Sequence, residues 1–360
     1  MKFSSKQNER DARERLRAFW AGSSLGRPAL HMTVKKTGVS DTIWTGEPDR
    51  KKRDLMPEWQ VWTNMRRINN VEYAAEAFPS VELVWGANIS LLAIQAGGDY
   101  EYDENGHAWV KPLPEVFDRP APSFDPSLEI IRKLDACYEK AAEAFAGKAY
   151  INPPVMLDAL TTLSLLRQPD QLCVDMIERP DVVKEMCAAL TDLYIKDYDY
   201  FYQKISHQGF GETSSWLQAM AEGRFEAVQC DFAVMISPAM FEEFVLPDLE
   251  RLTRYFDYSL YHLDGTSQMR FLNQLRSLPR LTGIQWNPEP AAGSPTGWLD
   301  AFREIRKRKF CIHIWCDTLE EAVILTRELG PDGLMLVVRE QFDSEAAAEA
   351  AIKRIEAACR

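Results

Sequence analysis

Hydrophobic positions along this chain switch between two spacings, and the switches mark alternating strands and helices. Short apolar runs such as 259–263 predict strands, because they are too short for a buried helix. Longer segments with apolar residues three and four positions apart, such as 128–146 and 237–256, predict amphipathic helices. The second helix opens with Ser237 and Pro238, which is typical of an N-cap followed by proline at the first helical position.

The order of these segments predicts a barrel. Strands that alternate with helices favour a parallel sheet, and no GxGxxG turn follows the first strand, as a dinucleotide-binding sheet would require. We therefore predict one α/β domain over residues 1–360, a closed (β/α)8 TIM barrel with an N-terminal helix and a long loop excursion before the third strand. The predicted strands are 29–34, 81–85, 150–156, 212–216, 259–263, 281–286, 310–315 and 333–338. The predicted helices are 5–22, 59–77, 128–146, 158–166, 170–177, 180–206, 237–256, 267–277, 297–308, 318–329 and 344–358.

Two connecting regions carry further expectations. Within the excursion at 95–126, Asn105 and Gly106 predict the turn of a small hairpin. The residues from Arg224 to the helix at 237 are interpreted as a loop.

Composition narrows the class of protein. The net charge of −12 argues against a nucleic-acid partner. The sequence contains no run of 18 apolar residues, so we predict no membrane span. The charged N-terminus lacks the apolar core of a secretory signal. Seven cysteines without CxxC spacing are typical of reduced thiols, so we expect a cytoplasmic protein.

His262 and Asp264 are the first candidates for chemistry. They lie two residues apart at the end of a predicted strand, so both side chains point to the same side. A catalytic zinc site needs three protein ligands and one open position, and the third ligand could be Glu340, Cys230 or Cys316. We take Glu340 as the predicted third ligand. Alternatively, Asp264 orients His262 as a general base, or the two form a structural pair.

Tryptophans and polar residues gather near the predicted strand ends. Aromatic walls bind flat rings by stacking and methylated ammonium groups by cation–π attraction. Large aromatics can equally plug the end of a barrel without any ligand. The candidate substrate-binding residues are Trp85, Asn88, Trp216, Gln285, Trp286, His313 and Trp315.

Several segments together resemble the uroporphyrinogen decarboxylase superfamily. The helix SPAMFEEFVLPDLERL at 237–252, the strand that ends in His262, and GIQW at 283–286 carry the similarity. The opening ERLRAFWAGSSLGRPALHMTV at 14–34 is also similar to the first helix and strand of that superfamily, whereas 36–126 match poorly. The resemblance implies a barrel fold, in a superfamily that includes zinc-dependent methyltransferases acting with corrinoid proteins.

The sequence departs from both branches of this superfamily. The decarboxylases carry an Arg-rich segment after the first strand and an Asp after the second, where this chain has KKTG at 35–38 and WGAN at 85–88. The methyltransferases bind zinc through His-x-Cys and a later Cys, where this chain has His262-x-Asp264 and VRE at 338–340. A site made of His, Asp and Glu is suited to polarising oxygen, not sulfur.

The leading hypothesis is therefore a methyltransferase-like enzyme. It would move a methyl group from a small methylated substrate, a methoxylated aromatic or a methylated amine, to a corrinoid carried by a separate partner protein. No DxHxxG cobalamin-binding motif is present in the chain. The alternatives are a lyase or decarboxylase that uses His262 on a small acid without a metal, and a non-catalytic ligand-binding barrel. A homodimer would be ordinary for the superfamily.

Overall fold

The computed structural model describes residues 6, 8–37, 43–206 and 211–359, and 52% of it is helical. The first positions of the predicted helix at 5–22, residues 5 and 7, lie outside the described part. The strands are β1 Ala29–Lys35, β2 Val71–Ala75, β3 Ser80–Val81, β4 Tyr100–Tyr102, β5 Ala108–Val110, β6 Tyr150–Ile151, β7 Glu212–Ser214, β8 Met220–Glu222, β9 Phe225–Gln229, β10 Tyr258–Asp264, β11 Gly283–Asn287, β12 Cys311–Cys316 and β13 Leu334–Phe342. The helices are α1 Glu9–Trp20, α2 Arg50–Arg53, α3 Pro57–Asn69, α4 Trp85–Ile89, α5 Leu91–Gln95, α6 Glu129–Ala144, α7 Ala159–Arg167, α8 Pro169–Glu178, α9 Pro180–Ser206, α10 Pro238–Phe244, α11 Leu246–Tyr255, α12 Leu272–Ser277, α13 Leu299–Lys307, α14 Leu319–Leu329 and α15 Glu345–Ala358.

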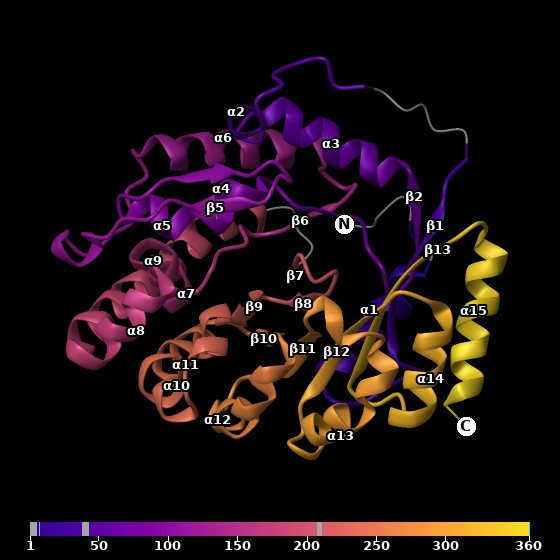
Figure 1. Ribbon diagram of the computed structural model, residues 1–360. Helices are drawn as coiled ribbons and strands as arrows, with labels where there is room; N and C mark the ends of the chain where they lie inside the picture. Colours follow the sequence, from indigo (N-terminus) through magenta and orange to yellow (C-terminus); the bar gives the residue numbers. More distant parts are fainter. Residues whose placement is uncertain (1–5, 7, 38–42, 207–210, 360) are drawn as a thin grey trace.

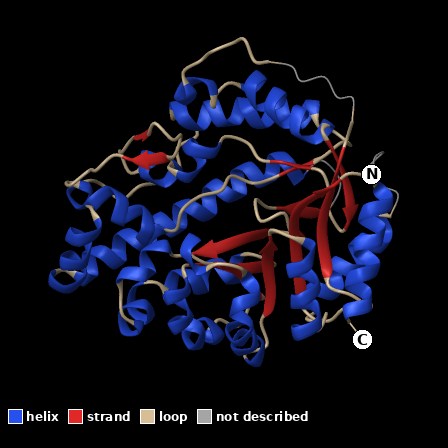
Figure 2. Cartoon of the chain, turned by 45° about the vertical axis from the view of Figure 1, so that its right-hand side comes forward, coloured by secondary structure: helices blue, strands red, loops and turns tan. Residues whose placement is uncertain are grey.

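A seven-stranded sheet forms the centre of the molecule. Its order is β2-β1-β13-β12-β11-β10-β9, and every pair is parallel except β1 with β2. Strands β3 and β6 form a separate parallel pair, and β4–β5 and β7–β8 are antiparallel hairpins. Figure 2 shows the strands gathered together with helices around them. Among the described residues, ladder hydrogen bonds do not join the β3–β6 pair to the seven-stranded sheet. The structure therefore shows a mixed α/β fold, and closure of the predicted barrel stays a prediction.

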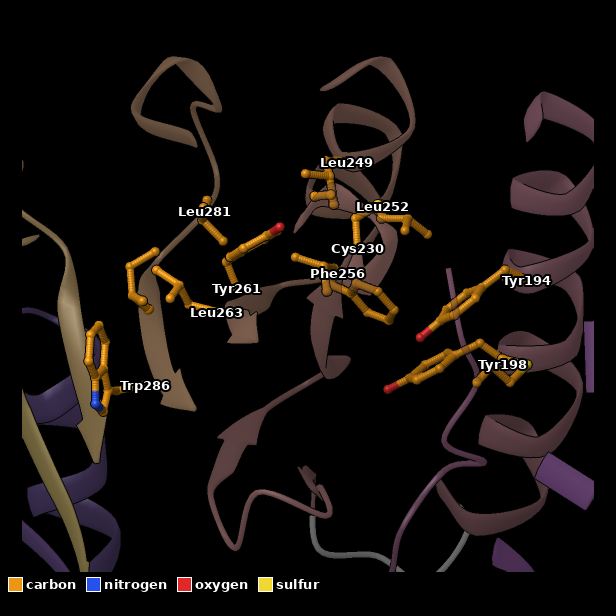
Figure 3. Packing of buried hydrophobic residues seen from close by; sticks show 14 of the residues in the cluster. Tyr194, Tyr198, Cys230, Leu249, Leu252, Phe256, Tyr261, Leu263, Leu281 and Trp286 are labelled. Atoms are coloured by element: carbon orange, nitrogen blue, oxygen red, sulfur yellow. The ribbon is translucent and has the colours of Figure 1, made fainter. Parts of the chain in front are cut away.

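The two faces of this sheet carry different side chains, because successive residues of a strand point to opposite sides. The outer face packs against helices, and Figure 1 shows α13, α14 and α15 grouped beside the strands β11 to β13. Figure 3 shows Tyr261 and Leu263 of β10 in this outer core, with Tyr194 and Tyr198 of α9 nearby. The inner face takes the alternate residues of the same strands.

The inner face is covered at its amino-terminal end by α1. Trp20 of this helix donates a hydrogen bond from Nε1 to Met220 O at 2.8 Å. Phe19 and Trp20 belong to the same buried cluster as Phe225 of β9 and Leu260 of β10. The carboxyl ends of the strands therefore remain as the end at which polar residues can meet a ligand.

Helix caps follow several of these strands directly. The predicted N-cap is confirmed at α10, where Ser237 Oγ accepts from Met240 N. At α14, Thr318 and Glu321 form a capping box. Each cap fixes the start of a helix close to a carboxyl strand end, which keeps the connecting loops short.

Five of the eight predicted strands are confirmed as members of the central sheet: β1, β10, β11, β12 and β13. The hairpin predicted at Asn105 and Gly106 is confirmed as the turn between β4 and β5. The strands predicted at 81–85 and 150–156 shorten to two residues each. Pro153 and Pro154 cannot donate ladder hydrogen bonds, and Trp85 begins α4 instead of ending a strand.

Two further predictions are wrong. The helix predicted at 59–77 ends at Asn69, and its last part is β2, because Val71 and Tyr73 pair with β1 along its free edge. The strand predicted at 212–216 pairs only with β8, while the strand beside β10 is β9, in the region interpreted as a loop. All five residues of β9 are buried, including the polar Glu226 and Gln229, whose presence hides the strand in the sequence.

Glu226 gives this fold a pH-dependent weakness. The side chain is 1% exposed, Oε1 accepts from Ala227 N at 2.8 Å, and Oε2 is buried without a hydrogen-bond partner. Burial raises the pKa of Glu226 from its usual 4.5 to about 8. The unfolded chain releases this proton above 4.5 while the folded chain keeps it, so folding stability is lost as the pH rises from 4.5 towards 8.

We therefore expect Glu226→Gln to stabilise the protein at alkaline pH. The gain in free energy of unfolding should be near zero at about pH 4 and on the order of 4 kcal/mol at about pH 8. Urea unfolding at both pH values measures it, with Asp343→Asn, whose side chain is 88% exposed, as the control. A gain of the same size at both pH values would contradict the assignment.

Candidate metal and active site

The register of the sheet lines up polar residues across its inner face. Gln229 of β9 lies opposite His262 of β10, His262 opposite Gln285 of β11, and Gln285 opposite His313 of β12. Neighbouring strands are about 4.8 Å apart, so these four side chains form one continuous row. The row is buried, with Gln285 and His313 fully shielded from solvent.

Gln285 fixes the orientation of His262. The Gln285 Oε1 atom lies at hydrogen-bonding distance from His262 Nδ1, while its Nε2 donates to Trp286 O at 2.9 Å. An amide oxygen only accepts, so His262 carries its proton on Nδ1, and Nε2 keeps a free lone pair. Burial lowers the pKa of His262 below its usual 6.5, so the ring is neutral at pH 7. A neutral imidazole with an oriented lone pair is the form that binds metals.

Two carboxylates face this lone pair. His262 Nε2 lies 4.0 Å from Asp264 Oδ1, and ligand atoms of Asp231, His262 and Asp264 all lie within 4.8 Å of one another. Asp231 begins the 3-10 helix Asp231–Met235, directly after β9. Asp264 ends β10 and accepts a hydrogen bond from Asn287 Nδ2 at 2.7 Å. The three residues therefore come from two adjacent strand ends.

The unpaired oxygen of Asp231 tests whether this set fits a metal. Asp231 Oδ1 is buried and has no hydrogen-bond partner, which costs free energy unless a cation or proton satisfies it. Burial, with Asp158 and Asp264 nearby, raises the pKa of Asp231 well above its usual value. One imidazole nitrogen and two carboxylates are hard or borderline donors, and zinc binds both kinds with a fourth position left open. The donor set therefore fits a divalent cation.

Two tryptophan rings lie near His262 and next to each other. The Trp216 and His262 rings are 5.0 Å apart between centroids, and Trp216 and Trp315 are 6.1 Å apart. Trp216 lies in the turn of the β7–β8 hairpin, not on a strand of the seven-stranded sheet. The next residue, Leu217, accepts from His313 Nε2 at 2.9 Å through its carbonyl, which anchors the turn to the inner face. The predicted aromatic wall therefore contains Trp216 and Trp315.

Glu340 and Trp286 do not belong to the site. Glu340 Oε2 accepts a hydrogen bond from Leu319 N at 2.8 Å and so caps α14. Asp231, not Glu340, is the third residue beside His262 and Asp264. Trp286 points to the outer face, where it contacts Trp298 and Phe302. Alternation along β11 explains the error, because Gln285 and Trp286 cannot both point inward.

The remaining candidates lie elsewhere. Trp85 is 43% exposed at the start of α4, and Asn88 in the same helix is buried and donates to Leu83 O. Among the described residues, no hydrogen bond or ring contact joins either one to His262. Cys230 and Cys316, considered as ligands, lie in the outer core, and burial raises the pKa of both thiols.

Asp231 and Asn287 were missed by the sequence analysis. Asp231 stands two residues after Gln229, as Asp264 stands two after His262, so recognising β9 as a strand would have placed both carboxylates side by side. Asn287 lies opposite Asp264 in the register. The signal was the sequence QCD at 229–231 after an apolar run, matching HLD at 262–264.

Comparison with known proteins adds no family or relative to this geometry. No family model matches the chain, and no curated protein matches it either. No helix in the described ranges combines the length and apolar character that crossing a membrane requires.

The tautomer of His262 is directly measurable. We expect the ring nitrogen spectrum of the protein to show His262 protonated at Nδ1, because Gln285 accepts that proton. Gln285→Leu should remove this preference and weaken metal binding about 10- to 100-fold, while Gln285→Glu should keep it. Gln203→Leu, on an exposed position of α9, is the control. Protonation at Nε2 in the unsubstituted protein would refute the orientation.

Proposed function

We propose that this chain is a metal-dependent methyltransferase built on a uroporphyrinogen decarboxylase-like (β/α)8 barrel. The observation that carries the proposal is the convergence of Asp231, His262 and Asp264 beside the Trp216 and Trp315 rings. In this proposal the substrate is a small compound with an oxygen-bound methyl group. The acceptor is the cobalt of a corrinoid carried by a separate protein.

Each residue has a defined part in this proposal. Asp231, His262 and Asp264 would hold a divalent metal, zinc in the related methyltransferases, and the bound metal would supply Lewis acidity toward a substrate oxygen. Gln285 keeps the His262 lone pair directed at the site, and Asn287 holds Asp264. The tryptophan rings stack on a flat substrate and exclude water from one side of it.

The donor chemistry favours oxygen as the methyl-bearing atom. Thiolate-rich sites select soft ligands such as sulfur, whereas imidazole and carboxylates suit metals that bind oxygen. By the resemblance, Asp264 stands where the methyltransferases of that superfamily have a cysteine, so the proposal disfavours thiol activation in this chain. Methoxylated aromatics combine an oxygen-bound methyl group with a ring that stacking can hold.

Exposed apolar residues beside the site support a protein partner. Val234 and Met235 are 42% and 57% exposed, and both belong to the 3-10 helix that begins at Asp231. In this proposal the two side chains would form part of a larger apolar surface that another protein covers. A corrinoid protein bound there would bring the methyl acceptor to the open side of the ligand set.

One observation favours a second candidate, a decarboxylase or lyase that acts on a small acid without a metal. Burial raises the pKa of Asp231 well above its usual value, which favours the protonated form of this carboxyl when no cation is bound. A protonated acid close to His262 could deliver a proton to a carbanion. Release of CO2 from small carboxylic acids by metal-free protein would favour this candidate.

Metal content is the first test of the proposal. We expect about one zinc per chain in protein purified without a histidine tag, because three ligands and one open position make a catalytic site. His262→Ala and Asp231→Asn should each lose the zinc. His107→Ala, at a ring 69% exposed beside the β4–β5 turn, should keep it. Elemental analysis after dialysis measures all four proteins, and absence of zinc from the unsubstituted protein after zinc loading would refute the site.

Methyl transfer is the second test. Zinc-loaded protein should transfer the methyl group of a methoxylated aromatic to cob(I)alamin. The change in absorbance of the corrinoid measures this reaction. Trp216→Ala should lower kcat/KM about 2- to 10-fold, because one stacking contact is lost. Trp109→Ala, at a ring 53% exposed on β5, should leave the rate unchanged. Zinc-loaded protein that transfers no methyl group from any oxygen-bound donor would exclude the proposed reaction.

A further inference from the structure

Arg339 lies near the carboxyl end of β13, beside the tryptophan wall. Met335 and Val337 of the same strand belong to the inner cluster, and Arg339 follows two residues later, where the pairing of β13 with β1 shifts register. Its guanidinium carbon lies 4.7 Å from the centroid of the Trp315 ring. It also forms an ion pair with Asp317 at 3.4 Å.

A continuous series of ring contacts connects Arg339 with the metal ligands. Arg339 stacks on Trp315, Trp315 contacts Trp216, and Trp216 contacts the His262 ring. The guanidinium therefore marks the outer end of an aromatic wall whose inner end is His262. A flat substrate lying along this wall would have one end near the metal ligands and the other near a fixed positive charge.

The position of Arg339 decides between the two substrate classes that aromatic walls can bind. A methylated ammonium needs the electron-rich face of a tryptophan, and the guanidinium already covers a face of Trp315. The positive charge of the Arg339 guanidinium would also repel a methylated ammonium. A carboxylate, in contrast, matches the planar fork of an arginine and forms charge-assisted hydrogen bonds with it.

The present partner of Arg339 can be exchanged. The side chains of Arg339 and Asp317 are 54% and 76% exposed, and ion pairs in such positions are weak because water screens them. A substrate carboxylate held by stacking on Trp315 would compete with Asp317 at high effective concentration. The arginine thus has donor capacity available for a ligand.

We propose that Arg339 determines substrate specificity by binding the carboxylate of a methoxylated aromatic acid. The ring of this acid lies along Trp315 and Trp216, and its methoxyl group points toward His262. The inference rests on the proposed function and narrows its substrate class to anions. Arg339 acts by binding the substrate, and takes no part in the methyl transfer itself.

Binding measurements test this proposal without any turnover. The probes are 4-methoxybenzoate, the uncharged 4-methoxybenzyl alcohol and the cationic benzyltrimethylammonium, titrated by calorimetry into zinc-loaded protein. The unsubstituted protein should bind the benzoate at least about 10-fold more tightly than the alcohol, because a charge-assisted hydrogen bond is lost with the carboxylate. Arg339→Gln should abolish this preference and bind the ammonium more tightly than the unsubstituted protein does.

Two further variants make the test specific. Arg303→Gln is the control, because it removes the same charge at an arginine that is 46% exposed and paired with Asp300. This variant should retain the preference for benzoate. Asp317→Asn removes the competing carboxylate and should strengthen benzoate binding. This variant keeps Arg339 in place and so tests the proposal even if Arg339→Gln does not fold.

Two outcomes would overturn the proposal. One is an unchanged preference for benzoate in Arg339→Gln. The other is that the unsubstituted protein binds the ammonium as tightly as Arg339→Gln does, or more tightly. The same titrations in zinc-free protein separate this proposal from the previous one. Arginine-dependent benzoate binding in a protein that never binds zinc would remove the methyltransferase proposal and leave an anion site in place.

Discussion

The parallel ladder from β9 to β13 determines where the polar side chains of the candidate site lie. Its two-residue alternation sends Tyr261 and Trp286 outward to the helices and His262 and Gln285 inward. The register then brings inward residues of neighbouring strands to the same height. A one-residue slip of β10 would send His262 into the apolar outer core, where its polar nitrogens would lose their partners. Packing of the outer face thus holds the polar inner row in register.

This arrangement accepts buried polar atoms that the fold alone does not satisfy. Asp231 Oδ1 and His313 Nδ1 are both buried without hydrogen-bond partners, and each such atom costs about 1–3 kcal/mol. His262, by contrast, is held through Nδ1 by Gln285, so that only Nε2 is left for a ligand. The unpaired oxygen of Asp231, close to the oriented ring of His262, is what a binding site requires.

Sequence patterns predicted the parts of this site that depend on local periodicity. His262 and Asp264 lie at the end of a predicted strand, and their spacing alone indicates a shared side. Asp231 was not predicted as a site residue because Glu226 and Gln229 interrupt the apolar pattern of β9. Both residues are buried only because neighbouring elements cover the strand, which the sequence alone does not indicate. Glu340 was misplaced for a related reason, since a carboxylate after a strand can cap the next helix as easily as bind a metal. The fold shows the same division, because five strands of the central sheet follow from periodicity, whereas β2 exists only through pairing with β1.

If the proposed metal is bound, the charges of the site predict that anion recognition would have to come from outside the three residues that hold it. Two carboxylates and a neutral imidazole around a divalent cation add up to no net charge, so the metal centre as a whole would attract an anion weakly. The tryptophan wall is neutral, and the aromatic faces themselves favour cations. Arg339 reverses that preference at the far end of the wall, where its pairing with the exposed Asp317 leaves it accessible. A substrate with a carboxylate at one end and a methoxyl oxygen at the other would therefore find an attractive partner at both ends, whereas an amine would find one at neither.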